Sequence, residues 1–90
     1  MKQNENNDGP ELNLEEKVLE AYFFNRCPRD PNPGLSVYVR DDKTTQQIID
    51  DLAETLTVDD KTVVRYMLQN NYVLTTQEDG SPIWVIYRIK

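Results

Sequence analysis

The sequence predicts an α+β domain of three short helices and a small antiparallel β-sheet. Three stretches with apolar residues at helical spacing each follow a capping residue, and residues 35–40 alternate apolar and polar side chains. Two segments rich in β-branched and aromatic residues flank the turn signal Asp79-Gly80 near the C-terminus. With 90 residues, of which 38% are hydrophobic and 29% charged, the chain has room for one globular core.

The N-terminal part divides into a tail and a first helix. Residues 1–11 hold no large apolar residue after the initiator, so we expect a disordered polar tail followed by one domain over 12–90. Asn13 and Glu16 have the spacing of a capping box, which predicts a helix over 14–25. Its expected apolar face comprises Leu14, Val18, Ala21 and Tyr22, widened by Leu19, Phe23 and Phe24.

A proline-rich segment follows the first helix. Pro28, Pro31 and Pro33 each fix a backbone angle and lack a donor, so neither a helix nor a strand is expected to continue through 25–34. The segment is either a rigid connector, which we favour, or a separate functional surface. The alternation over 35–40 then predicts a short strand.

Two more helices and a β-hairpin complete the expected fold. Thr44 and Gln47 form a second capping-box pattern before a helix over 45–55. Thr57 is the expected cap of the third helix, and Asn70-Asn71 its stop. The expected apolar positions are Ile48, Ile49, Leu52 and Leu56 in the second helix, and Val63, Val64, Met67 and Leu68 in the third.

The hairpin is expected to pair residues 72–76 with residues 82–89. Pro82 fits best as the first residue of its strand, where a missing donor does least harm. Trp84 and Ile86 would form an apolar patch suited to a protein partner if the first helix left them uncovered.

The element order resembles that of the winged helix-turn-helix family. The matching residues are Thr44-Thr45, Ile48-Ile49, Leu52-Ala53, Leu56-Thr57-Val58, Thr62-Val63-Val64-Arg65, Asn71-Tyr72-Val73 and Asp79-Gly80. The resemblance implies a three-helix winged-helix domain in which one short strand joins a C-terminal hairpin, the wing. The proline-rich segment departs from the family pattern, as does Asn71 where a glycine is common.

The resemblance also implies DNA binding, with the third helix in the major groove and the wing on the backbone. The residues expected to read base edges are Thr62, Arg65 and Gln69, which helical periodicity places away from the apolar face. Those expected to contact phosphates are Lys43, Thr44, Thr45, Lys61 and Arg88. For each of these residues, an ordinary solvated surface position is the alternative.

The charge distribution weighs against DNA binding. A net charge of -6 excludes a polycation that grips nucleic acid by bulk charge, and the negative excess lies on the first two helices. Asp59, Asp60 and the acidic wing tip also weigh against DNA. The hypotheses are therefore a dimeric, double-stranded DNA-binding transcriptional regulator or, as the alternative, a winged-helix module for protein interaction or self-association. Mimicry of DNA ranks third.

The sequence does not predict an enzyme. It lacks histidine, has the single cysteine Cys27, and has no phosphate-binding glycine-rich loop, so we expect no catalytic residue, metal or cofactor. No apolar run approaches the length of a membrane helix, and the first residues do not resemble a secretory signal. We therefore expect a cytoplasmic protein that contacts no membrane.

Overall fold

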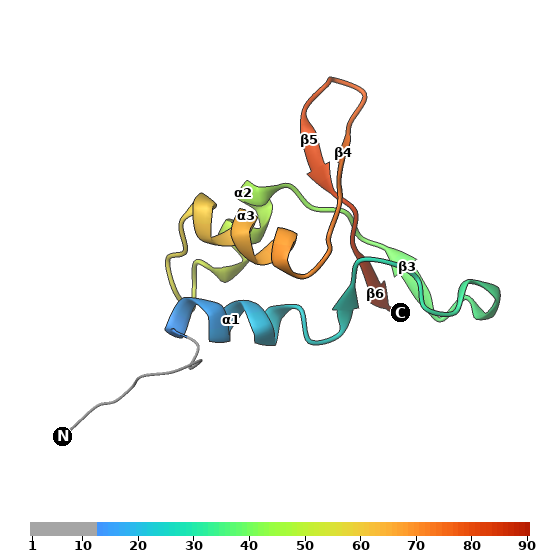
Figure 1. The fold of residues 1–90 in the computed structure, drawn as a ribbon, viewed down its shortest axis with the longest axis horizontal. Coiled ribbons are helices and arrows are strands. Elements are labelled where there is room, and N and C mark those ends of the chain that lie inside the picture. The colour runs from blue at the N-terminus through green and yellow to red at the C-terminus, as the bar shows by residue number, and fades with distance from the viewer. Residues whose placement is uncertain (1–12) are drawn as a thin grey trace.

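A computed structural model describes residues 13–90 as an α+β fold in which three helices pack beside short antiparallel strands (Figure 1). The predicted disordered tail, residues 1–11, lies outside the described residues. The elements in chain order are α1 (Leu14–Tyr22), β2 (Arg26–Cys27), a 3-10 helix (Pro33–Leu35), β3 (Tyr38–Arg40), α2 (Thr45–Leu52), α3 (Asp60–Gln69), β4 (Leu74–Thr76), β5 (Pro82–Trp84) and β6 (Tyr87–Ile89). Among these residues, no helix is both long and apolar enough to cross a membrane.

Side chains cap the start of each of the three α-helices, two of them as predicted. The Asn13 side chain accepts the Glu16 N–H at 2.8 Å, and Thr44 with Gln47 forms a complete capping box at α2. The predicted cap of α3 was wrong, because Asp59 rather than Thr57 accepts the Thr62 N–H at 2.8 Å. The capping carboxylate satisfies a backbone donor that would otherwise lack a partner at the helix start.

The helix ends follow local hydrogen bonding. The helices α1 and α2 stop three residues earlier than predicted, since tight turns over 23–25 and 53–55 replace the helical pattern. The predicted stop of α3 is confirmed. Asn71 has a φ of 69°, and the Tyr72 N–H donates to the Met67 carbonyl at 2.9 Å. This is a Schellman arrangement, in which a left-handed residue satisfies the last carbonyls of a helix.

One C-terminal segment serves two antiparallel sheets. Strand β5 pairs with β4 in a hairpin, while β6 lies between β2 and β3. The predicted hairpin is thus confirmed for β4 and β5, and β5 begins at Pro82 as expected, whereas β4 begins at Leu74 rather than at the predicted Tyr72. The second half of the predicted strand 82–89 was assigned wrongly, because β6 pairs with strands from the N-terminal half. Backbone hydrogen bonds between Lys43 and Trp84, at 2.9 and 3.2 Å, join the two regions.

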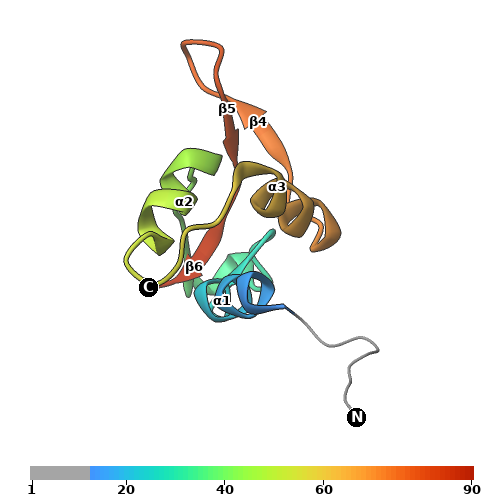
Figure 2. The ribbon, with the colours of Figure 1, turned by 90° about the vertical axis from the view of Figure 1, so that its left-hand side faces the viewer.

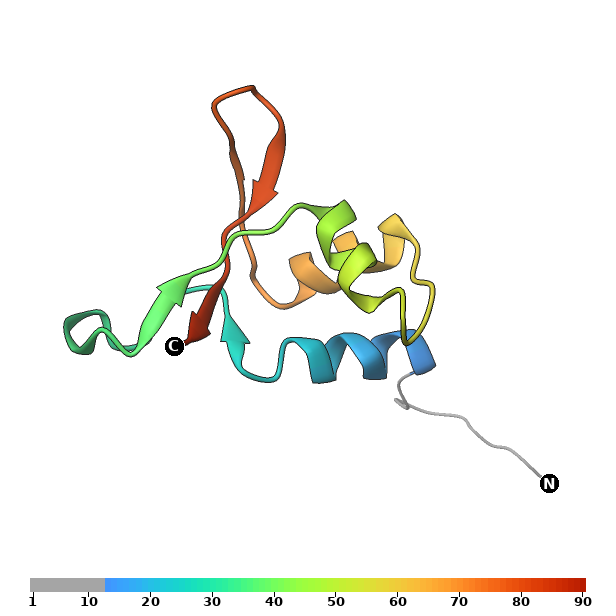
Figure 3. The same cartoon turned by 180° about the vertical axis from the view of Figure 1, so that it is seen from behind.

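The proline-rich segment is more structured than predicted. Its first residues form β2, Pro33 opens the 3-10 helix, and the predicted strand 35–40 begins only at Tyr38. Ser36, with a φ of 55°, is in the left-handed region and interrupts the extended backbone. The connector between β2 and β3 reaches away from the helices at the far end of the sheet (Figures 1 and 3).

The core lies where the three helices meet the C-terminal strands. Trp84 and Ile86 are fully buried, so the condition for the predicted hairpin patch is not met. Leu19 of α1 and Phe23, directly after it, are buried. Leu14, predicted on the apolar face of the first helix, and Phe24, predicted to widen that face, are exposed. The other core residues are Ile48, Leu52, Val58, Val63, Met67 and Tyr72.

Candidate functional site

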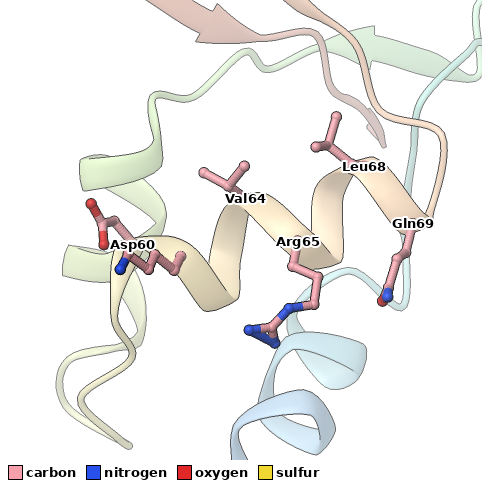
Figure 4. A pocket seen from close by; sticks show the side chains of 6 residues that line it. Asp60, Val64, Arg65, Leu68 and Gln69 are labelled. Atoms are coloured by element: carbon pink, nitrogen blue, oxygen red, sulfur yellow. The ribbon is translucent and has the colours of Figure 1, made fainter.

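The exposed side of α3 carries two parallel rows of side chains. Residues four positions apart lie above one another on a helix, and the first row is polar: Lys61, Arg65 and Gln69. The second row is Asp60, Val64 and Leu68. Figure 4 shows Arg65 and Gln69 directed toward α1, whereas Val64 and Leu68 point away from it. The outer face of α3 is therefore polar on one side and largely apolar on the other.

The buried face of α3 is rotated from the predicted one. Thr62, Val63 and Met67 are buried, and the Tyr66 ring stacks on Phe23 with centroids 5.5 Å apart. The predicted outward position of Thr62 was wrong, since only 7% of the residue is exposed. Its hydroxyl lies 3.4 Å from a carboxylate oxygen of Glu15 on α1. Thr62 cannot reach a base edge unless α1 and α3 separate.

Because α3 is rotated in this way, two apolar residues expected in the core lie toward solvent. Leu68 is 61% exposed and Val64 is half-buried. The chain continues from α3 with Val73 and Leu74, which are 60% and 47% exposed. Exposed apolar residues thus occur both on α3 and at the start of the hairpin, and Val64 lines surface together with Leu68 on one side and Leu74 on the other.

A groove lies between this apolar row, the start of α2 and the inner face of the hairpin. Its volume is about 420 Å³, within the range of natural ligand pockets. We call it the α3–hairpin groove, and its lining residues are Thr44, Thr45, Gln46, Val64, Leu74, Ser81, Pro82 and Trp84. None of these residues is charged. Figure 2 shows the hairpin on the opposite side of α2 and α3 from α1.

The register of the hairpin produces this apolar wall. Leu74 pairs with Trp84, and Thr76 pairs with Pro82, so these four side chains share one face of the hairpin. The buried Trp84 belongs to both the core and the groove lining, and its indole Nε1 donates to Thr45 Oγ1 at 2.9 Å. The hydrogen bond fixes the groove lining to the first turn of α2.

Several residues expected to contact phosphate already have partners within the fold. Lys43 Nζ lies 3.2 Å from Asp51, and Arg88 Nε lies 3.2 Å from Asp41. The Thr44 hydroxyl caps α2, and the Thr45 hydroxyl accepts the indole proton. Lys61, by contrast, is exposed and has no carboxylate within 4 Å in the part of the chain that the structure describes. The predicted cations therefore do not act as one free cluster.

Acidic groups border the polar row of α3. The pKa of Asp59 is lowered by hydrogen bonds from Thr62 and, to a smaller extent, by the charges of Arg65 and Lys61. Burial raises the pKa of the Tyr66 hydroxyl, and the nearby charge of Glu20 adds to this effect. Negative charge from α1 and from the cap of α3 therefore acts close to the side chains expected to read DNA.

No protein-family model, curated protein or solved structure matches this chain. The chemistry of the α3–hairpin groove therefore carries the functional inference.

The structure divides the predicted site residues into three sets. Thr44 and Thr45 line the α3–hairpin groove, and the polar row of α3 brings together Lys61, Arg65 and Gln69. Lys43, Arg88 and Thr62 belong to neither set, because ion pairs or burial hold them elsewhere.

Val64, Leu74 and Pro82 line the groove although none of them was predicted as a site residue. The two-residue period of the hairpin could have placed Leu74 and Pro82 on the face of Trp84 once the register was known. The position of Val64 depends on the rotation of α3, for which the sequence holds no local signal.

Proposed function

We propose that the chain is a small winged-helix protein that associates with another protein through the α3–hairpin groove. The observation that carries this proposal is the uncharged lining of the groove, which includes the exposed Leu74 and, in the same row of α3 as the exposed Leu68, Val64. Exposed apolar surface of this kind is typical of protein interaction sites.

The order of the helices and strands along the chain supports the winged-helix part of the proposal. Strand β3 precedes α2, the segment 53–59 joins α2 to α3, and a hairpin follows α3. Strand β5 pairs with β4 on one side, and on its other side the Trp84 backbone is hydrogen-bonded to Lys43. The hairpin then corresponds to the wing, and α3 to the helix that the family resemblance associates with recognition.

The ion pairs favour a protein partner over DNA. Nucleic-acid affinity comes largely from Lys and Arg side chains that neutralise phosphates. Lys43 and Arg88 are already neutralised by Asp51 and Asp41. A protein partner needs no such free cations and gains from covering Leu68 and Leu74.

Site-specific photo-crosslinking tests the proposal. A benzoylphenylalanine replaces Leu74 in the full chain within its source cells, and the same group replaces Glu54, an exposed residue near the other end of α2, as the matched control. We expect the Leu74 probe to yield one discrete protein adduct that Val64→Asp abolishes. Equal crosslinking from both positions, or an adduct that persists in the Val64→Asp variant, would contradict the proposal.

DNA binding is a second candidate, favoured by the exposed row Lys61, Arg65 and Gln69. Arg and Gln can each make paired hydrogen bonds to a base edge. If about five phosphates are contacted, affinity falls about 500-fold between 50 and 200 mM salt.

Fluorescence anisotropy with mixed duplexes tests this second candidate at 50 mM salt. Binding that Arg65→Ala abolishes would support it, provided that Arg29→Ala, in the exposed β2–β3 connector, leaves the signal unchanged. The absence of any anisotropy change at micromolar protein would reject it.

A further inference from the structure

We infer that the partner segment of the α3–hairpin groove is cationic: one large apolar side chain enters the groove, and Lys or Arg residues flank it. This inference rests on the proposed function and adds the chemical class of the partner. It depends on three carboxylates that border a groove whose own lining is uncharged.

Two of these three carboxylates accept hydrogen bonds from residues that line the groove. Asp79 accepts hydrogen bonds from the Ser81 N–H at 2.9 Å and the Ser81 hydroxyl at 2.7 Å. Asp50 accepts from the Gln46 side-chain amide at 2.9 Å. Ser81 and Gln46 both line the groove, so Asp79 marks its hairpin side and Asp50 its α2 side.

Asp60 completes the border on α3. It precedes Val64 by one helical turn, in the same exposed row, and Val64 lines both the α3–hairpin groove and the outer face of α3. We call Asp50, Asp60 and Asp79 the acidic rim. All three residues are exposed to solvent.

The negative charge of the acidic rim is largely uncompensated, because the nearby cations are paired or lie elsewhere. Lys43, next to the start of α2, is held by Asp51 at 3.2 Å. Lys61 and Arg65 belong to the other row of α3, and Figure 4 shows Arg65 directed toward α1. An apolar floor inside a negative border is complementary to an apolar anchor between positive charges, and it repels a phosphate-bearing ligand.

The walls of the groove indicate that the partner side chain that enters it is large and apolar. Val64 contributes from α3, and Leu74 and Pro82 contribute from the hairpin. A volume of about 420 Å³ admits a large apolar side chain, while the uncharged hydroxyl and amide groups of Thr44 and Gln46 can meet the adjoining peptide backbone. An amphipathic segment supplies both parts of this pattern.

Peptide selection followed by titration tests the inference. Random 12-residue peptides displayed on phage are selected on the full chain and counter-selected on the Val64→Asp variant. We expect the peptides that require Val64 to carry one large apolar residue flanked by Lys or Arg. One such peptide, fluorescently labelled, is then titrated at 50 mM salt against rim variants.

The rim variants are isosteric, so that the hydrogen bonds to Ser81 and Gln46 can persist. The triple variant Asp50→Asn, Asp60→Asn and Asp79→Asn is expected to bind the labelled peptide about tenfold more weakly. The matched control Glu16→Gln, Asp30→Asn and Glu54→Gln removes the same charge elsewhere and is expected to change affinity less than twofold.

The possible outcomes separate the inference from the proposed function. Peptides that require Val64 but are neutral or acidic would overturn the cationic inference and leave the groove as a binding site. An equal loss of affinity in the rim and control variants would also overturn the inference, since net charge alone would then explain the effect. If no selected peptide requires Val64, the proposed function itself fails.

Discussion

The indole Nε1 of Trp84 donates a 2.9 Å hydrogen bond to the hydroxyl of Thr45, which joins the last strands to the first turn of α2. Trp84 is fully buried, so its indole proton has no access to water as an alternative partner. The Thr45 hydroxyl is the only acceptor the indole has among residues 13–90. One side-chain contact therefore positions both the α3–hairpin groove and part of the core.

Thr45→Val tests this contact with little change in shape. The variant removes the acceptor and leaves a buried donor unsatisfied, which is expected to lower the free energy of unfolding by about 1–3 kcal/mol. Urea denaturation followed by the fluorescence of Trp84, the single tryptophan, measures the change. Thr75→Val, at an exposed position of β4, is the matched control and should stay within about 0.5 kcal/mol of the wild type.

Asp42 links an ion pair to the C-terminal segment, and its titration should affect stability. Its carboxylate accepts the Ile86 N–H at 3.1 Å and makes two hydrogen bonds with Arg40, at 2.6 and 2.9 Å. Hydrogen bonds from the Arg40 guanidinium are the main reason that the pKa of Asp42 lies below its ordinary value of 3.8. Since the native pKa is depressed, the stabilising contribution is present above the unfolded value and is lost as the pH falls through the native value.

Urea unfolding between pH 7 and pH 2.5 measures this dependence. Asp42→Asn should reduce the fall in stability on acidification, and Asp42→Ala should cost about 1–3 kcal/mol at pH 7 because the buried Ile86 N–H loses its acceptor. Glu54→Gln removes a charge from an exposed side chain and controls for net charge. An acid profile identical in wild type and Asp42→Asn would contradict the role assigned to the ion pair.

Asn71 has a backbone angle that favours glycine. Its φ of 69° lies in the left-handed region, where a side chain with a Cβ atom costs about 1–2 kcal/mol unless it is Asn or Asp. We therefore expect Asn71→Gly to be more stable than Asn71→Ala by about 1 kcal/mol in thermal or urea unfolding. The neighbouring helical residue Gln69 provides the control, since there the Ala variant should be more stable than the Gly variant. The same order at both positions would contradict the assigned conformation.

Features encoded by adjacent residues could be predicted from the sequence. The caps at Asn13 and Thr44, the stop at Asn71 and the hairpin turn at Gly80 each depend on a side chain or a backbone angle within a few residues. Such signals survive in any tertiary context because their partners are always close in the chain. The prediction of three helices followed by a hairpin rested on these signals together with the spacing of apolar residues.

Features that depend on distant partners could not be predicted in the same way. The two residues of β2 are a strand only because β6 lies beside them, and the rotation of α3 depends on Tyr66 packing against Phe23 of the α1 region. Helical periodicity alone allows either Val64 or Thr62 to face the core. Packing selected Thr62 and thereby created the apolar groove, so the candidate site itself was the part that sequence reasoning missed.

The link between α1 and α2 offers a final quantitative test. The Tyr22 hydroxyl donates to Asp51, which also pairs with Lys43, and the Arg26 guanidinium lies 4.2 Å from the centre of the Tyr22 ring. Burial and the hydrogen bond to Asp51 raise the pKa of Tyr22, and the same hydrogen bond lowers the pKa of Asp51.

Tyr22→Phe keeps the ring beneath Arg26 and removes only the hydroxyl. A double-mutant cycle with Asp51→Asn should give a coupling of about 0.5–1.5 kcal/mol in urea unfolding. The same cycle with Tyr38→Phe should give none, and equal couplings in the two cycles would show that the effect of Asp51 does not pass through the Tyr22 hydroxyl.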